Sequence, residues 1–218
     1  MAPSLYSMQT SPPARAVQMC AKAINLDLKI INVDVIGGEH MKEEYLKKNP
    51  QHTVPLLDDD GFLLADSHAI MVYLVSKYGK DDSLYPKDLK KRAIIDHRLH
   101  YDSSCLFIRG LVIAKGILFQ GEKTIDPKKV EAIEESYQVV EKFLEESPYV
   151  AGDSLSLADL SFVTSIITWH VTFAPVNAAK YPKITAWIKR MQKLPYYQEV
   201  NQKGLKDVEA TIKSKLAN

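Results

Sequence analysis

Cysteine is scarce in this chain, and no segment is long and apolar enough to cross a membrane. Among the 218 residues only Cys20 and Cys105 are cysteines, and they form no C-x-x-C pair. A disulfide framework, a cysteine-based zinc site and a dithiol redox motif are therefore unsupported. Each cysteine falls in a helical apolar pattern, so we expect both to be buried and structural. The start lacks the apolar core of a signal peptide, and the sequence predicts a soluble cytoplasmic protein.

An excess of charge of one sign is also missing. Lysine and arginine number 28 against 27 acidic residues, which gives a formal net charge of +1. Without a basic face, we expect neither nucleic acid nor an anionic membrane as a partner. No cluster of histidine, cysteine and acidic residues has ligand spacing, so no metal is expected. Hydrophobic residues make up 46% of the chain, enough for a packed core in one large domain or two small ones.

The stretch from Asn49 to Ile70 organises the N-terminal part. Its two short apolar runs, at 54–57 and 62–65, are joined by three aspartates and a glycine, which predicts a β-hairpin. Pro55 lacks an N–H, so it lies at an edge, at a strand start or at a special peptide bond. Asp66-Ser67 predicts the start of a helix to Tyr78. The N-terminus of that helix favours a carboxylate, and Asp66 could hold an ammonium group, so an amino-acid head group fits there.

The first 80 residues or so predict a compact α/β unit. A strand at 5–8, a helix that starts at or just after Ser11 and runs to about Ile24, a strand at 28–35 and a short helix at 42–48 precede the hairpin. We expect the strand at 28–35 to be buried on both faces, because it is almost continuously apolar. The element order is thus βαβ, then α, then ββα.

The rest of the chain predicts helices only. After a polar linker at 80–88, the segment 89–120 fits one long helix or two joined ones. Asp126 is a plausible N-cap for a helix to about Glu146, and Ser156 with Asp159 has the spacing of a capping box. Tyr181-Pro182 opens another helix. A short turn begins at 194, and the tail from Gln202 is only weakly amphipathic.

Five motifs point to a known family. They are Ser11-Pro12-Pro13-x-Arg15-Ala16, NPQHTVP at 49–55, DSHAI at 66–70, LYPKD at 84–88 and LSLADLS at 155–161. In this order they resemble the cytosolic glutathione transferases of the insect delta and epsilon classes. NPQHTVP, DSHAI and the LPYY at 194–197 are closer to epsilon. The resemblance implies a thioredoxin-like glutathione-binding domain at 1–79, a linker at 80–88 and an all-helical domain at 89–218. It also implies a cis peptide bond before Pro55, a homodimer and glutathione as co-substrate.

Ser11 matches the position of the family's catalytic serine. A hydroxyl that donates a hydrogen bond to sulfur, at the positive end of a helix, favours the thiolate over the thiol. The plainer interpretation is that Ser11 is only an N-cap. Tyr6 is the rival donor, because other classes use a tyrosine near the first strand.

The resemblance also places the glutathione contacts. Asp66 and Ser67 match the residues that bind the γ-glutamyl group, although many relatives have glutamate where Asp66 stands. Val54 would bind the cysteinyl backbone through its own N–H and C=O. The remaining expected contacts are His40, His52, Thr53, Pro55 and His68.

The electrophile is expected between the two domains, against the long helix and the tail. By resemblance its walls are Ser104, Phe107, Ile108, Leu111, Ala114, Lys115, Leu118, Phe119, Val208 and Ile212. The alternative for each is ordinary helical core. Leu111 stands where some relatives have an arginine, and Lys115 makes this wall unusual. Gly110 and Gly116 suggest a roomy pocket or a bend.

The leading function is conjugation of glutathione to small hydrophobic electrophiles, in detoxification of xenobiotics or insecticides. Glutathione-dependent elimination, as in a dehydrochlorinase, and isomerisation use the same site. A carrier of hydrophobic ligands and a transferase-like interaction domain are the alternatives outside catalysis.

Overall fold

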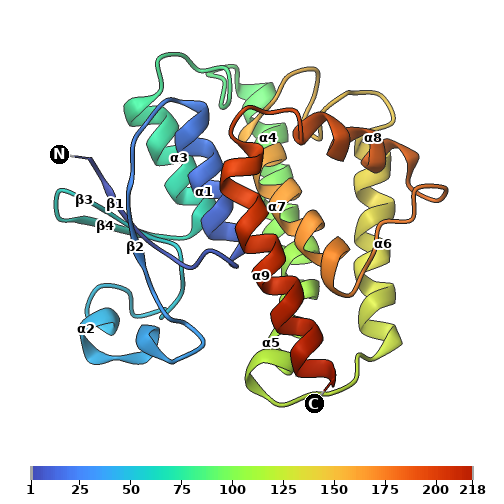
Figure 1. Cartoon of the computed structure of the whole chain (residues 1–218). Coiled ribbons are helices and arrows are strands. Elements are labelled where there is room, and N and C mark those ends of the chain that lie inside the picture. The colour runs from blue at the N-terminus through green and yellow to red at the C-terminus, as the bar shows by residue number, and fades with distance from the viewer. Residues whose placement is uncertain (1, 218) are drawn as a thin grey trace.

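A four-stranded mixed sheet with helices beside it forms the N-terminal part of the molecule (Figure 1). The computed structural model describes residues 2–217. The spatial order of the strands is β2-β1-β3-β4; β1 and β2 are parallel, and the other two pairs are antiparallel. The elements are β1 (Ser4–Ser7), α1 (Pro12–Ala23), β2 (Lys29–Asn32), a 3-10 helix (Glu39–Met41), α2 (Glu43–Leu46), β3 (Leu56–Asp59), β4 (Phe62–Ala65) and α3 (Ser67–Tyr78). The predicted order is therefore confirmed.

The strand predicted at 28–35 is shorter and more exposed than expected. β2 spans only Lys29–Asn32 and lies at the edge of the sheet, where Ile30 is 47% exposed. The expectation of burial on both faces was wrong, because an apolar run does not reveal whether its strand is central or at an edge. Val33, just beyond the strand, is buried.

The hairpin has the turn that its sequence predicts. Asp60 and Gly61 both have positive φ, at 55° and 85°, as the tight turn between two antiparallel strands requires. Gly61 also donates its N–H to Asp58 Oδ1 at 3.0 Å. The peptide bond between Val54 and Pro55 is cis, as expected, and β3 begins at the residue that follows Pro55.

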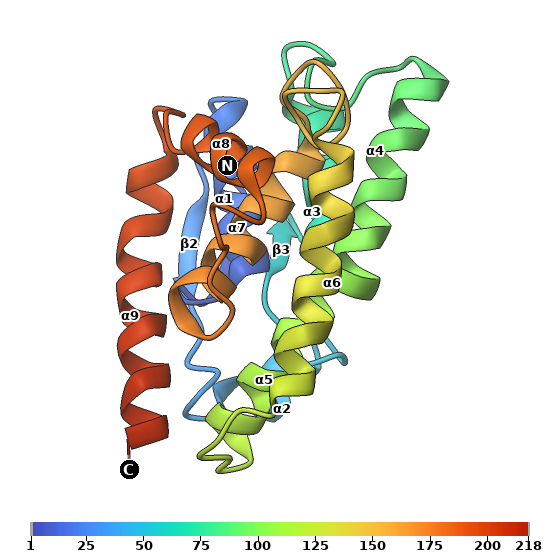
Figure 2. The ribbon, with the colours of Figure 1, turned by 90° about the vertical axis from the view of Figure 1, so that its right-hand side faces the viewer.

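The second part of the chain is helical throughout the described residues. Figure 2 shows α9 running along the side of the molecule opposite α4. The helices are α4 (Leu89–Tyr101), a π-helical segment (Asp102–Leu106), α5 (Phe107–Phe119), α6 (Pro127–Phe143), α7 (Leu157–Thr172), α8 (Pro182–Met191) and α9 (Tyr197–Ala217). The alternatives of one long helix or two joined helices are both partly correct, since α4 and α5 are continuous through the π-helical segment. The weakly amphipathic tail is longer and more regular than expected, because Val200, Val208 and Ile212 of α9 are buried.

The helix starts follow the caps in the sequence. Asp126 accepts the N–H of Lys128 at 2.9 Å at the start of α6. Ser156 and Asp159 form the predicted capping box of α7. Asp159 does more than cap, because its fully buried carboxylate also accepts Val150 N–H at 2.9 Å and Trp187 Nε1–H at 3.0 Å. Asp159 therefore connects α7 to α8 through Trp187, and to the segment before α7 through Val150.

Helix α1 packs between α3 and α7, and a buried arginine ties it to the second part. Arg15 Nη1 donates to Asn201 Oδ1 at 2.8 Å, and Nη2 donates to Thr168 Oγ1. Burial lowers the pKa of Arg15 to about 10, so the guanidinium remains charged at neutral pH. Cys20 of α1 is buried as expected, and burial raises the pKa of its thiol. Cys105, in the π-helical segment, is partly exposed, contrary to expectation.

The glycines of α5 serve packing. A Cβ at Gly110 would lie 2.2 Å from the Trp169 ring, and one at Gly116 would lie 2.4 Å from the Glu122 carboxylate. They let neighbouring groups approach the helix and do not widen a pocket, so that expectation was wrong. The irregularity of the long helix lies at 102–106 instead.

Candidate functional site

A cavity of about 610 Å³ lies where the sheet unit meets α5 and α9. From the N-terminal part it is lined by the predicted residues Ser11, His40, His52, Thr53, Val54, Pro55, Asp66, Ser67 and His68. From the helical part it is lined by the predicted Phe107, Ile108, Leu111, Ala114, Lys115, Leu118, Phe119 and Val208. The fold thus brings together two sets of side chains that lie far apart in the sequence.

Ser11 lies at the N-terminus of α1 and at the cavity wall. Its Oγ accepts the N–H of Ala14 at 3.4 Å, and the residue is only 7% exposed. Two prolines follow it in the first turn, where a missing N–H removes no helical hydrogen bond. Since the oxygen only accepts here, the hydroxyl hydrogen remains available to a group in the cavity. The positive end of α1 favours an anion at the same place.

Tyr6, the rival hydroxyl, lies elsewhere. It does not line the cavity, and its hydroxyl accepts a hydrogen bond from Lys48 Nζ. Its ring packs edge-on against Tyr45, with 6.1 Å between the centroids, in the smaller core cluster that also holds Val33 and Leu56. A strand directs neighbouring side chains to opposite faces, so Tyr6 faces away from the buried Leu5 and Ser7.

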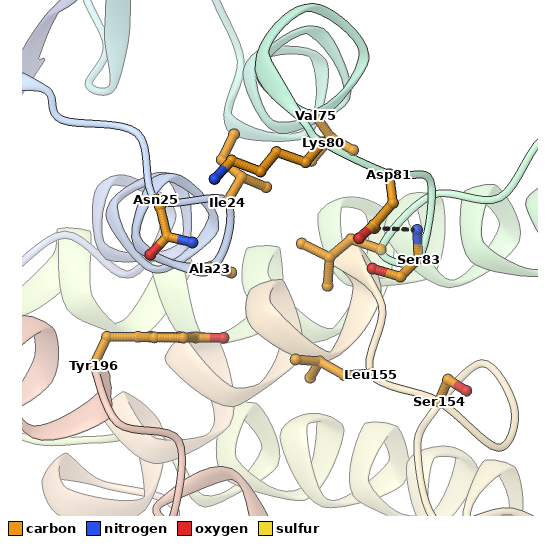
Figure 3. Close-up of a pocket in the computed structure, with 11 residues that line it drawn as sticks. Ala23, Ile24, Asn25, Val75, Lys80, Asp81, Ser83, Ser154, Leu155 and Tyr196 are labelled. Atoms are coloured by element: carbon orange, nitrogen blue, oxygen red, sulfur yellow. Dashed lines mark hydrogen bonds between the residues drawn. The ribbon is translucent and has the colours of Figure 1, made fainter.

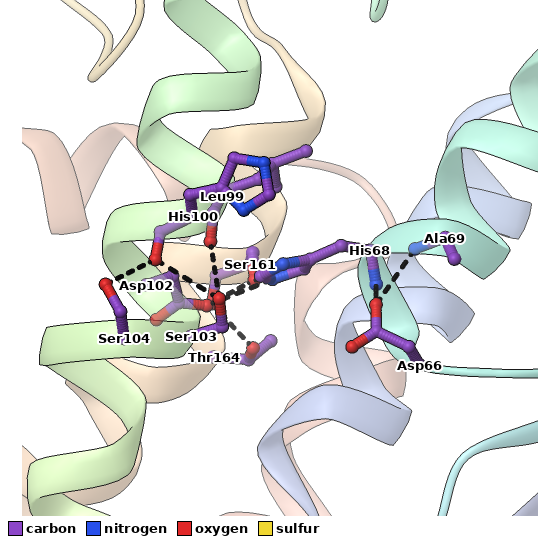
Figure 4. A network of polar contacts seen from close by, with 10 residues as sticks. All are labelled: Asp66, His68, Ala69, Leu99, His100, Asp102, Ser103, Ser104, Ser161 and Thr164. Carbon is purple, nitrogen blue, oxygen red and sulfur yellow. Dashed lines mark hydrogen bonds and ion pairs between the residues drawn. The ribbon is translucent and has the colours of Figure 1, made fainter.

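Asp66 and Ser67 lie at the N-terminus of α3. Asp66 Oδ1 accepts the N–H groups of His68 and Ala69 at 2.9 and 3.0 Å, which caps the helix (Figure 4). No described residue bonds the other carboxylate oxygen, Oδ2. Asp66 has a φ of 74° and a ψ of 120°, a backbone conformation outside the left-handed helical region that residues other than glycine rarely adopt. One oxygen therefore holds the helix start, while the second is free to meet an ammonium group.

The loop before β3 presents backbone groups to the cavity. Thr53 C=O accepts hydrogen bonds from Tyr45 Oη at 2.6 Å and Asn49 Nδ2 at 3.0 Å, which fixes the loop from behind. Neither the N–H nor the C=O of the next residue, Val54, forms a hydrogen bond with any described residue. A ligand with an extended backbone could pair with both groups, as a neighbouring strand would.

Two histidines of the cavity wall, His40 and His52, lie close together with their rings tilted at 48° to each other. The ring centroids of His40 and His52 are 6.1 Å apart, and His40 Nδ1 is buried without a hydrogen-bond partner among the described residues. Burial, and then the nearby His52, lowers the pKa of His40. An unpartnered buried nitrogen beside a second imidazole suits an acceptor such as a carboxylate.

His68 and Asp102 connect the two parts of the molecule at the cavity wall. Figure 4 shows the His68 ring extending from α3 toward Ser161 of α7, with 2.8 Å between Nε2 and Oγ. Ser161 Oγ donates to Asp102 Oδ2, so its single hydrogen is used there and His68 Nε2–H is the donor to Ser161. Asp102 Oδ1 is buried without a partner among the described residues. His68 therefore lines the cavity with its Nε2 already engaged.

Sequence reasoning missed Asp102, because the helix before it carries many charged residues and nothing in the pattern distinguishes this one. Asp102 begins the π-helical segment, and such segments occur often at functional sites. Thr168 and Trp169 of α7 also line the cavity and were not predicted, because they belong to an uninterrupted buried helix.

Two expected wall residues do not reach the cavity. Ser104 donates its hydroxyl to His100 C=O at 2.7 Å, and its neighbour Ser103 lines the cavity instead. The π-helical segment changes the rotation of the helix at this point, so spacing counted for a regular α-helix fails. Ile212 is 1% exposed and packs in the core of the helical part. Its assignment to the wall of the electrophile site was therefore wrong.

A smaller pocket of about 370 Å³ lies apart from this site (Figure 3). It is bounded by the end of α1, the segment after α3, the loop before α7 and Tyr196. None of the residues predicted for glutathione or for the electrophile lines it. The larger cavity is therefore the candidate active site.

Comparison with known proteins shows which family the chain resembles over most of its length. The model of the glutathione S-transferase N-terminal domain matches residues 5–82, and that of the C-terminal domain matches residues 94–195. The chain is 46% identical over 220 residues to glutathione S-transferase 1 of Manduca sexta, with all of both chains covered.

Solved structures give the same result. The chain is similar to an epsilon-class glutathione S-transferase from the housefly Musca domestica, with a TM-score of 0.95, 48% identity and 98% of each chain covered. It is also similar to a glutathione transferase homologue from Drosophila mojavensis that was solved with bound glutathione. That comparison has a TM-score of 0.93 and 51% identity, and covers 98% of this chain and 97% of the other.

Proposed function

This chain belongs to the glutathione S-transferase family, and we propose that Ser11 holds the glutathione thiol as a thiolate for attack on hydrophobic electrophiles. The observation that carries this is the Ser11 hydroxyl, buried at the cavity wall with its hydrogen available, at the positive end of α1. A donor aimed at sulfur stabilises the anion more than the neutral thiol and so lowers the thiol pKa.

Glutathione would lie along the N-terminal side of the cavity. Its α-ammonium would meet Asp66 Oδ2, and its α-carboxylate would meet Ser67 and the N-terminus of α3. Val54 would pair with the cysteinyl backbone through N–H and C=O. The glycyl carboxylate would lie by His40 and His52, whose ring centroids are 6.1 Å apart.

The electrophile would lie against α5, where apolar side chains dominate. The thiolate attacks the electrophilic carbon, a carbon–sulfur bond forms, and the leaving group departs with the bonding electron pair. The thiol proton has already left to solvent. Apolar walls favour hydrophobic electrophiles, which suits detoxification of xenobiotics such as insecticides. The proposal divides the chain into a glutathione-binding domain at 1–79, a linker at 80–88 and a helical domain at 89–218.

We also propose that the enzyme is a cytosolic homodimer. Among the described residues, no helix is long and apolar enough to cross a membrane. Leu89 at the start of α4 is 80% exposed, Ile94 is 43% exposed, and Phe62 of β4 is 49% exposed. These three exposed apolar side chains suit a protein interface. Light scattering at micromolar concentration should give twice the 24.6 kDa of one chain, and a mass of 24.6 kDa would contradict the dimer.

The test of Ser11 is ultraviolet titration of the thiolate of bound glutathione in wild type and Ser11→Ala. We expect the midpoint to rise and kcat to fall by up to about 100-fold, because loss of one preorganised donor has effects of this size or larger at oxyanions. The pH profile of kcat/KM should shift upward with the midpoint. Ser11→Thr keeps both the hydroxyl and the cap, so it should titrate like wild type.

Two results would contradict the proposal. An unchanged midpoint in Ser11→Ala would transfer the role to another donor, and Tyr6→Phe measured in parallel would show whether it is Tyr6. Glutathione binding by wild type without conjugation of any electrophile would contradict the enzyme function.

A further inference from the structure

Lys115 is the only lysine or arginine among the described residues that line the large cavity. It lies on α5, is exposed, and makes no hydrogen bond or ion pair with any described residue. Arg109 of the same helix differs, since it donates to Ala132 C=O and Ser136 Oγ and lies 3.3 Å from a Glu135 carboxylate oxygen. The side chain of Lys115 is thus an unpaired cation at the wall where the electrophile is expected.

No carboxylate among the described residues forms an ion pair with Lys115. Leu111 and Phe119 lie four residues to either side and share its face of α5. The carboxylates that line the cavity are Asp66 and Asp102. Asp66 caps α3, and Asp102 is held by Ser161 near the His68 ring. An apolar wall with one free ammonium therefore offers a position for a ligand that is mostly hydrophobic and carries one negative charge.

We propose, on the basis of the transferase function above, that Lys115 selects electrophiles that carry an anionic group, such as an aromatic carboxylate. The ring of such a substrate would pack on the apolar side chains of α5, and its carboxylate would pair with the ammonium. A bound substrate covers the lysine and removes water from it, which strengthens the attraction relative to an open surface pair. Neutral electrophiles gain only the apolar contact.

A matched pair of aryl chlorides tests this inference. They are 4-chloro-3-nitrobenzoate and its neutral amide, 4-chloro-3-nitrobenzamide. In each, the thiolate attacks the carbon that bears chlorine and the electrons pass into the ring and the nitro group. The carbon–sulfur bond is then complete and chloride leaves. The two compounds differ in intrinsic reactivity, so each enzymatic kcat/KM is divided by the rate constant of the uncatalysed reaction with glutathione.

The variants are Lys115→Met, Lys115→Arg and, as a control, Lys189→Met. Lys189 is an exposed lysine of α8 that does not line the cavity, so its replacement changes the net charge equally. We expect Lys115→Met to lower the corrected kcat/KM for the benzoate about fivefold, the upper end for a partly exposed ion pair. The value for the amide should change less than about twofold. Lys115→Arg should retain the preference, and added salt should weaken it in wild type.

Equal effects of Lys115→Met on both substrates, or no effect on either, would overturn the inference. A lower melting temperature with an unchanged substrate ratio would also overturn it, and would assign Lys115 a structural role instead. Failure of the wild type to conjugate either compound would contradict the proposed function itself, which keeps the two failures distinct.

Discussion

The two sides of the cavity are built in different ways. The side that we propose for glutathione, the glutathione side, uses backbone groups, helix N-termini and capping side chains from many short segments, including Ser11, Val54 and Asp66. The side that we propose for the electrophile, the electrophile side, is mostly one helix, α5, with apolar side chains and one lysine. Polar recognition needs several groups at fixed positions, whereas an apolar wall needs only area. The first side is therefore suited to one ligand and the second to many.

The difference is also visible in how each side is supported. Behind the glutathione side, Tyr45 and Asn49 fix the carbonyl of Thr53, and the His68 ring is anchored to α7. On the electrophile side, Ile108 and Phe119 are 39% and 50% exposed and little holds their side chains. Substitutions should therefore have specific, large effects on the first side and small, substrate-dependent effects on the second.

The largest effect is expected at Asp159, which lies at the start of α7 and does not line the cavity. Asp159→Ala should lower the free energy of unfolding by about 4 kcal/mol, because it leaves the buried donors of Val150, Ser156 and Trp187 without an acceptor. The control Asp126→Ala removes an exposed cap and should lower it by about 1 kcal/mol. Urea denaturation measures both. Activity per folded molecule should stay near wild type, and a large fall in turnover would show that the cap at the start of α7 is needed for the geometry of the cavity.

The next effect separates the two roles of Asp66. Asp66→Asn keeps an oxygen for the cap of α3 but removes the charge that would meet the ammonium. The KM for glutathione should rise about tenfold, as expected for a lost hydrogen bond to a charged group, with kcat and the melting temperature unchanged. Asp66→Ala should add a loss of about 1 kcal/mol of stability, because the cap is lost too. A fall in kcat at constant KM would mean that the head group is placed wrongly.

The smallest effect tests the electrophile side. Phe119→Ala should lower kcat/KM for a hydrophobic aryl halide about fivefold and leave the KM for glutathione unchanged, because it removes only apolar contact. Val112→Ala is the matched control, since Val112 is 48% exposed on α5 but does not line the cavity. Steady-state kinetics with each substrate varied in turn provide the measurement. An equal effect of both substitutions would contradict the assignment of this helix face.

Much of the fold could be predicted from local chemistry. The Asp60-Gly61 turn, the proline-rich start of α1 and the capping box at Ser156 each contain the information for their own conformation. The residues that line the N-terminal side of the cavity could also be predicted, because caps and turns leave recognisable residues. The pairing of elements that lie far apart in the sequence could not be predicted in this way. β2 lies at an edge because β1 pairs with β3 on its other side, which nothing within 28–35 encodes.

The sequence by itself determined which residues begin helices and turns, since a hydroxyl, a carboxylate or a proline acts on backbone groups within four residues of itself. Only the tertiary structure decided which side chains meet. The π-helical segment turned Ser103 and not Ser104 toward the cavity, and the packing of α3 on α7 placed His68 beside Ser161 and Asp102. These contacts depend on the relative rotation and spacing of whole helices. That arrangement depends on the packing of the entire core, and no single motif determines it.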